Sequence, residues 1–439
     1  MSRVHVLTLG CPKNQVDAEV MLGVLARAGH ELVADPEQAD VLVVNTCAFI
    51  GPAKEESIDA VLDAARVKAG QAGRKLVVSG CLAQRYADEL RAGLPEVDAF
   101  VGTGDLTRIA EAVAAPGGSE PVVYRGTQHE LPAHGVSPRI RTGAWWTAYL
   151  KVSEGCDRRC AYCTIPTIRG RFVSSPVEAV EAEAGELLAA GARELVLVGQ
   201  DIAAYGRDLA DGTDLAALVG RLDALDGDFR LRLMYVQPDG VTDRLLNAIA
   251  NSTRVCAYLD IPLQHAAAPV LRAMGRSGSA QSHLELLARV RSVLPDITLR
   301  TTVMTGFPGE SARDFAELEG FLAEASFDYV GVFAYSPEEG TRAAALPGQV
   351  RSAIRASRAQ RLRDAADALG AERAAERVGS VQRVLIEGTD EDGALWGRTC
   401  GQAPEVDGIT LVDGAAVVGA FANLMIVDAV GYDLVGRVV

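Results

Sequence analysis

Short apolar runs without a helical period alternate with amphipathic stretches along most of the chain. In the first hundred residues the runs predict buried strands, and the stretches between them, apolar on one side, predict helices. The strand patterns cover 4–10, 41–46 and 75–80, and the helical patterns cover 16–28 and 55–69. Because strands and helices alternate, we predict a parallel α/β domain over residues 1–115.

The same alternation resumes after a stretch rich in Gly and Pro, which we interpret as a linker over 116–141 that lets the flanking domains move. Six further strand patterns follow, with amphipathic helical patterns between them. The strands are expected at 148–152, 194–199, 231–236, 257–262, 297–304 and 329–335, and helices at 177–190, 215–225, 244–250, 284–294 and 315–325. Six parallel βα units predict an open partial (β/α)6 barrel over 142–373, with its site at the carboxyl ends of the strands.

The C-terminal pattern changes to short strands separated by Gly and Asp turns. An Arg/Ala-rich helix is expected at 351–377, followed by strands at 381–386, 409–412, 424–430 and 434–439. Closely spaced short strands with turn residues predict a small antiparallel β-barrel over 375–439. The whole chain is therefore expected to be an α/β protein of several domains.

Composition and charge narrow the class of protein. Apolar residues make up 49% and charged residues 23% of the 439 residues, as in a globular protein. The net charge of -15 argues against a protein that binds nucleic acid mainly through phosphates. The uncharged stretch 414–427 is shorter than the ~20 apolar residues of a membrane span. We expect a cytoplasmic protein without a membrane segment.

Three cysteines follow the three strands of the first predicted domain. Cys11, Cys47 and Cys81 each come directly after a buried strand, and parallel strands bring such residues to one carboxyl edge. Three thiolates hold either a 4Fe-4S cluster with one open iron or a zinc ion with one open position. The alternative is that each is a small buried hydrophobic residue. Three cysteines in equivalent positions favour a site.

A second triplet, Cys156, Cys160 and Cys163, has C-x3-C-x2-C spacing and follows the first strand of the predicted barrel. This motif, with the aromatic Tyr162 before its third cysteine, resembles that of the radical S-adenosylmethionine (SAM) superfamily. The resemblance implies a 4Fe-4S cluster whose open iron chelates SAM, and an electron from that cluster that cleaves SAM to a 5′-deoxyadenosyl radical.

Other residues at the same predicted mouth are candidate SAM contacts. Gly306 and Gly309 lie in a Gly-rich turn that resembles the superfamily's adenine-side motif. Gln200 and His265 are polar candidates, and Arg300 could pair with the SAM carboxylate. A structural hydrogen bond is the alternative for His265, and a structural ion pair is the alternative for Arg300. The loop around the second triplet is basic and contains Arg158, Arg159, Arg169 and Arg171. The two remaining cysteines, Cys256 and Cys400, are expected to be inert.

This arrangement, with one cysteine triplet in the N-terminal domain and a second in the partial barrel, resembles that of the methylthiotransferases. In that family the first triplet holds a second 4Fe-4S cluster that carries the sulfur, and SAM serves both as methyl donor and as radical source. The string Gly10-Cys11-Pro12-Lys13-Asn14 resembles the branch that modifies a ribosomal protein, although Ala18 departs from the serine expected there. The implied substrate is an aspartate of small-subunit ribosomal protein twelve, methylthiolated at its β-carbon, free or on the ribosome. A flavodoxin or ferredoxin is the implied electron donor.

The C-terminal barrel resembles the TRAM domain, which often binds RNA. From residue 378 onward it carries three arginines against nine acidic residues, a net charge of -6. This balance predicts little direct nucleic-acid binding and favours docking of a basic ribosomal protein. The alternative for these acids is that they only keep the domain soluble. The alternatives are a tRNA adenosine methylthiotransferase, which would call for a basic barrel, and a non-catalytic iron–sulfur protein of ribosome assembly.

Overall fold

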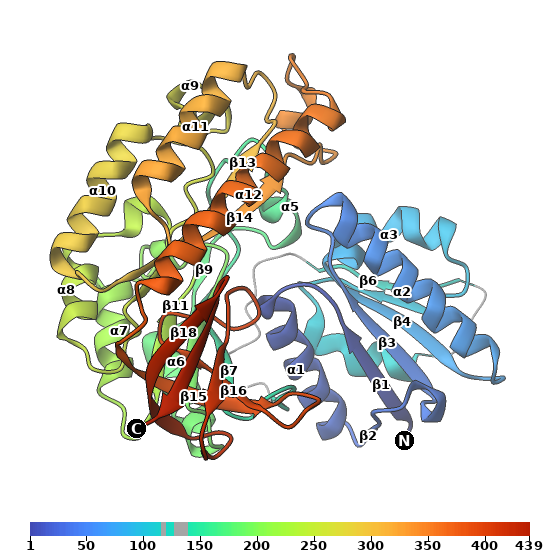
Figure 1. Ribbon diagram of the computed structural model, residues 1–439. Coiled ribbons are helices and arrows are strands. Elements are labelled where there is room, and N and C mark those ends of the chain that lie inside the picture. The colour runs from blue at the N-terminus through green and yellow to red at the C-terminus, as the bar shows by residue number, and fades with distance from the viewer. Residues whose placement is uncertain (116–119, 127–138) are drawn as a thin grey trace.

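The computed structural model describes residues 1–115, 120–126 and 139–439, and it shows three parts (Figure 1). The first part is a six-stranded sheet in the order β2-β1-β3-β4-β5-β6 in which every neighbouring pair is parallel. Its strands are β1 (Arg3–Thr8), β2 (Glu31–Leu32), β3 (Val41–Thr46), β4 (Lys75–Gly80), β5 (Ala99–Val101) and β6 (Val122–Tyr124). Its helices are α1 (Pro12–Arg27), α2 (Gly51–Ala69), α3 (Cys81–Gly93) and α4 (Ile109–Ala114). The predicted parallel α/β domain is confirmed.

The second part is the core, whose strands follow one another in chain order. They form two parallel sheets, β7-β10-β11 and β12-β13-β14, joined by a parallel bridge between Leu231 and Val255. The strands are β7 (Thr147–Lys151), β10 (Glu194–Val198), β11 (Arg230–Leu233), β12 (Tyr258–Asp260), β13 (Thr298–Thr305) and β14 (Tyr329–Ala334), with β8 (Ser153–Glu154) and β9 (Val173–Ser174) paired beside them. The helices are α5 (Ile165–Ile168), α6 (Val177–Ala189), α7 (Leu215–Asp223), α8 (Asp243–Asn251), α9 (Ala268–Ala273), α10 (Ala280–Val293) and α11 (Ala312–Ala325). The expected open partial barrel is confirmed.

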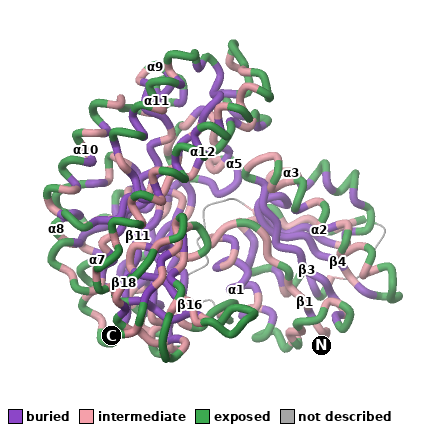
Figure 2. Tube along the Cα trace, in the orientation of Figure 1, coloured by how far each residue is buried: buried purple, intermediate pink, exposed green. Residues whose placement is uncertain are grey.

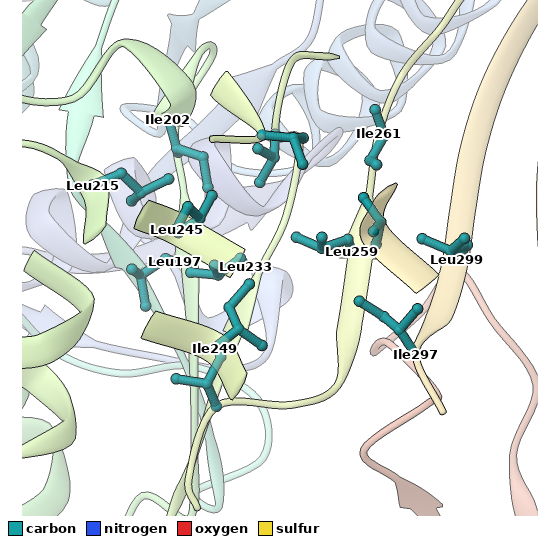
Figure 3. Close-up of a cluster of buried hydrophobic side chains, with 14 of the residues drawn as sticks. Leu197, Ile202, Leu215, Leu233, Leu245, Ile249, Leu259, Ile261, Ile297 and Leu299 are labelled. Atoms are coloured by element: carbon teal, nitrogen blue, oxygen red, sulfur yellow. The ribbon is translucent and has the colours of Figure 1, made fainter. Parts of the chain in front are cut away.

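The two faces of the core strands differ in chemistry. Leucines such as Leu197, Leu233 and Leu259 point toward the surrounding helices and belong to one buried apolar cluster (Figure 3). Each side chain of this kind contributes about 1.5–3 kcal/mol when fully buried. The alternate positions face the barrel interior and include the buried Glu194 and Arg232. The helices therefore pack on an apolar outer face, and the interior is left for polar groups.

The third part is a closed barrel in the order β15-β16-β17-β19-β18, preceded by the long helix α12 (Ser352–Ala375). Its strands are β15 (Val381–Thr389), β16 (Leu395–Thr399), β17 (Thr410–Asp413), β18 (Phe421–Val430) and β19 (Asp433–Val438). The predicted barrel is confirmed, with two refinements. β17 and β19 pair in parallel, and β16 had no strand pattern because Gly397 and Arg398 interrupt its apolar positions.

Buried segments run through the strands of both large parts, and exposed residues lie on the outer helices and turns (Figure 2). The predicted linker 116–141 falls largely on residues outside the described ones, and the domain boundaries stay a prediction. Within the described ranges, no helix is both long and apolar enough to cross a membrane.

Candidate functional site: two cysteine triplets at one interface

The first triplet lies along the carboxyl edge of the N-terminal sheet. Cys11 precedes α1, Cys47 follows β3, and Cys81 is the first residue of α3. The loops approach closely, because a Cβ on Gly10 would lie 2.8 Å from the Cβ of Cys47. Gly10 has a φ of +92°, which favours glycine. The parallel topology thus brings together three loops whose cysteines are far apart in sequence.

Asn14 connects these loops. Its side-chain amide donates to the carbonyls of Leu9, at 3.0 Å, and Thr46, at 2.9 Å. Its Oδ1 lies 3.6 Å from the Sγ of Cys81. Asn14 is fully buried and therefore holds the strand ends around the triplet in a fixed arrangement.

The Arg169 guanidinium reaches this edge from the core. Its Nη2 lies 3.3 Å from the Sγ of Cys81 and 2.6 Å from the Oδ1 of Asn14. Burial raises the pKa of Cys81 to about 12, and the Arg169 charge acts in the opposite direction. A positive donor beside the sulfur favours a ligating thiolate.

The second triplet lies in the loop between β8 and α5. The Sγ of Cys156 accepts the backbone N–H of Arg158 at 3.4 Å, and that of Cys163 accepts the N–H of Ile165 at 3.4 Å. The guanidinium of Arg276 is 3.9 Å from the Sγ of Cys160. These donors fit three cluster thiolates, because hydrogen bonds to sulfur stabilise the negative charge that such a cluster carries.

Burial opposes the free thiolates of this loop. It raises the pKa of Cys156 to about 11 and that of Cys163 to about 12. Metal binding must therefore release protons from these thiols. Within the described ranges, no three Cys, His, Asp or Glu side chains form a group that could hold a single metal ion. The irons of a cubane are spread over its corners, so its thiolates lie farther apart than those around one zinc ion.

A buried ion network lies between the two triplets. The ammonium of Lys151 on β7 is 2.6 Å from Asp17 of α1 and 2.8 Å from Glu154. Arg169 pairs with the same two carboxylates. Burial alone would raise the pKa of Glu154, but Lys151 and Arg169 hold it at about 2. The Gln200 side chain donates to Glu154, whereas its buried Oε1 has no hydrogen-bond partner among the described residues.

His265 and the Gly-rich turn form a buried unit of their own. His265 Nδ1 accepts the N–H of Ala267 at 2.9 Å, and its Nε2 is 3.4 Å from a Glu310 oxygen. Glu310 also accepts the N–H of Gly306 at 2.7 Å. The φ values of Gly306 and Gly309, +76° and +84°, lie in the left-handed region that glycine favours. The hydrogen bond from Ala267 supports the structural alternative for His265, whereas its buried Nε2 has no hydrogen-bond partner among the described residues. Contact of this unit with SAM stays a prediction.

Two other predicted residues have different surroundings. Tyr162 packs against an apolar cluster that includes Phe307, and burial and the neighbouring Cys160 raise its pKa well above the usual value. Arg300 lies between Asp260, at 3.4 Å, and Asp407 of the C-terminal barrel, at 3.2 Å. These carboxylates give Arg300 the structural ion pair that was the alternative, and its contact with SAM stays a prediction.

The residues that connect the triplets were not singled out from the sequence. Asn14 and Asp17 lie three positions apart on α1, the spacing of one helix face, which was the available signal. The sequence shows Arg169 only as part of a basic loop. Its contact with Cys81 spans 88 positions and two domains, so no local pattern shows it.

Three family models match successive parts of the chain. The uncharacterized protein family UPF0004 matches residues 3–102, the radical SAM superfamily matches 150–322, and the TRAM domain matches 378–439. The solved radical SAM methyltransferase TsrM from Kitasatospora setae is similar in fold, with a TM-score of 0.57 and 16% identity over 87% of this chain and 81% of that one. The cobalamin-dependent radical enzyme OxsB has a TM-score of 0.53 and 14% identity over 79% of this chain and 55% of that one. The chain is thus a radical SAM protein, a class that uses SAM and a 4Fe-4S cluster, with a C-terminal TRAM barrel.

Full-length relatives define the family more narrowly. "Ribosomal protein uS12 methylthiotransferase RimO" of Pelobacter propionicus is 45% identical over 99% of this chain and 98% of its own length. The proteins of that name from Geobacter sulfurreducens and Anaeromyxobacter sp. (strain K) are 45% and 46% identical over 100% of this chain and 98% and 93% of theirs. The chain belongs to the RimO family of radical SAM methylthiotransferases, as the sequence motifs predicted.

Proposed function

We propose that this protein attaches a methylthio group to the β-carbon of an aspartate in ribosomal protein uS12. Cys156, Cys160 and Cys163 hold the SAM-binding 4Fe-4S cluster, and Cys11, Cys47 and Cys81 hold a second one. When bound, the cluster of Cys156, Cys160 and Cys163 supplies the electron that cleaves SAM, and the cluster of Cys11, Cys47 and Cys81 supplies the sulfur. SAM is both the radical source and the methyl donor. Because ribosomes assemble in the cytoplasm, we place the protein there, with a flavodoxin or ferredoxin as electron donor.

The contact between Arg169 and Cys81 is the observation that carries this proposal. Arg169 lies six positions after Cys163, and its guanidinium is 3.3 Å from the thiol of the other triplet. The two triplets therefore share one interior between the N-terminal sheet and the core. A reaction that needs radical formation and sulfur donation at one carbon requires this proximity.

The remaining residues of the interface orient and shield that interior. Asp17, Lys151, Arg169 and Glu154 neutralise one another in the buried network, so no unpaired charge from this set remains in it. Ser57 donates to the carbonyl of Cys47 at 2.9 Å and fixes the loop after β3. The chain's own contribution is to hold both triplets still and to exclude water.

The acidic TRAM barrel supports a protein substrate. Of its three arginines, Arg398 is buried beside Glu387, while Arg383 and Arg437 pair with Asp228 and Asp413. The loop after β15 exposes three successive acids, Asp390, Glu391 and Asp392. Such a surface attracts a basic ribosomal protein and repels a phosphate backbone, so we expect little direct nucleic-acid binding.

Cysteine variants test the proposal under anaerobic conditions with reconstituted protein, dithionite and uS12. Cys156→Ala should abolish formation of 5′-deoxyadenosine. Cys47→Ala should still cleave SAM but yield no methylthiolated uS12 by mass spectrometry. Cys400→Ala, a cysteine outside both triplets, is the matched control and should leave product formation unchanged.

The outcomes separate the rival functions. Absence of 5′-deoxyadenosine from the wild-type protein would favour a non-catalytic assembly factor. Methylthiolation of tRNA adenosine instead of uS12 would favour the tRNA enzyme. Normal product from Cys47→Ala would refute the sulfur-donor role of the first triplet.

A further inference from the structure

Lys13 crosses from the N-terminal domain to the mouth of the core. It is the second residue of α1, two positions after Cys11. Its ammonium lies 3.9 Å from the centroid of the Tyr235 ring. Tyr235 comes two positions after the carboxyl end of β11, the end at which the core strands present their site. Lys13 therefore sits beside the first triplet and against the barrel mouth.

Among the described residues Lys13 has no carboxylate at ion-pair distance, although Glu154 and Asp260 act on its charge from farther away. Lys151, at the same interface, pairs with both Asp17 and Glu154. Lys13 forms no such ion pair within the described ranges, and the contact that places its ammonium is the Tyr235 ring. A partly buried ammonium on an aromatic face retains donors for an anionic ligand.

The core holds Tyr235 in place for this contact. Tyr235 has a φ of +64°, a left-handed conformation that is uncommon for a bulky residue. Its N–H donates to Asp260 at 3.3 Å, and Asp260 also lies 3.4 Å from Arg300. The nearby Asp260 is therefore engaged by the core, and the ring is a fixed support for Lys13.

We propose that Lys13 binds the side-chain carboxylate of the substrate aspartate, an inference that rests on the proposed function. The carboxylate is bonded to the β-carbon that reacts, so a cation that binds it places that carbon beside the first triplet. An adenosine has no carboxylate to offer. Lys13 thus selects an acidic side chain and positions it.

Peptide binding to the cluster-loaded protein, without reductant, tests this. The probe is a fluorescent uS12 peptide centred on the aspartate that the wild-type protein modifies, and a second peptide carries Asn there. Lys13→Met should weaken binding of the Asp peptide about 10- to 100-fold, as expected for a lost charge-assisted hydrogen bond. The Asn peptide should bind both proteins equally, and Lys13→Arg should retain the preference for Asp. Lys68→Met, a lysine that pairs with Asp98, is the control and should leave both affinities unchanged.

Three results would overturn the inference. Lys13→Met could retain the preference for the Asp peptide, which would show that another group binds the carboxylate. Lys13→Met could lose iron or alter the electron paramagnetic resonance spectrum of the first cluster, which would assign Lys13 to that cluster. Wild-type protein that does not modify uS12 would refute the proposed function, and this inference with it, whereas the first two results leave the proposed function intact.

Discussion

Replacing Glu194 by Gln should weaken the joint between the core and the C-terminal barrel. Glu194 is fully buried and accepts hydrogen bonds from Arg230, at 3.0 Å, Arg232, at 2.6 Å, and Arg398, at 2.6 Å. Burial alone would raise the pKa of Glu194, but the three arginines hold it well below its usual value. Gln keeps the shape of the Glu194 side chain and removes its negative charge. Glu387 of the barrel, which pairs with Arg398, is then the carboxylate that remains beside the three guanidiniums. Removal of one partner from a buried pair costs about 3–5 kcal/mol.

Urea unfolding of the cluster-free protein, followed by tryptophan fluorescence, measures this cost. Trp396 lies on β16, and a Cβ on Gly419 of the barrel would lie 2.2 Å from the Trp145 ring, so the tryptophans report on this joint. Asp413→Asn removes the exposed partner of Arg437 on the same barrel and is the control, with an expected loss of about 0–1 kcal/mol. If Glu194→Gln lowers the unfolding free energy no more than Asp413→Asn, the buried cluster does not stabilise the joint and the reasoning is wrong.

Two further predictions concern the first triplet and the response to acid. Gly80 has a φ of +93°, and a Cβ there would clash with the Asn45 side chain. Gly80→Ala should therefore lower the iron content of the reconstituted protein by about one cluster. Gly73→Ala, at an exposed glycine, is the control and should leave the iron content unchanged. Burial, reinforced by the Arg276 charge, lowers the pKa of His283 to about 4. The folded protein keeps the His283 ring neutral, so His283 makes its full contribution to the free energy of unfolding above the unfolded pKa of about 6.5. As the pH falls from about 6.5 to about 4, the protein loses up to about 3 kcal/mol of stability. His283→Gln should flatten that part of the pH profile of unfolding, and an unchanged slope would contradict the assignment.

The elements that sequence patterns predict are those long enough to show a period. The six core strands and β1, β3 and β4 lie where their apolar runs indicated. β2, β5 and β6 have two or three residues each, too few for a pattern, and their pairing depends on neighbours that are already in place. Tertiary context, rather than local preference, determines these edges of the sheet.

The candidate site divides in the same way. The positions of the cysteines followed from parallel topology and motif spacing, because both are properties of chain order. The side chains that connect the two triplets could not be predicted in this way, because Arg169 contacts Asp17 and Cys81 across a domain interface. Arg300 shows the reverse case, a residue whose position on a core strand suggested a ligand contact but whose side chain meets Asp407 of another domain.

The contacts of α1 argue against the domain movement that the linker composition suggested. The six core strands leave the barrel open, and α1 lies between the N-terminal sheet and that opening (Figure 1). Val16 of α1 packs with Tyr149 and Val196 inside the barrel, and Asp17 pairs there with Lys151. Separating the domains would expose this apolar contact, at about 1.5–3 kcal/mol for each apolar side chain that water reaches, while the charges of Asp17 and Lys151 would regain their hydration. Exposure of two such side chains, at about 3–6 kcal/mol, would leave at most about one molecule in a hundred open at equilibrium, so both triplets keep a constant separation.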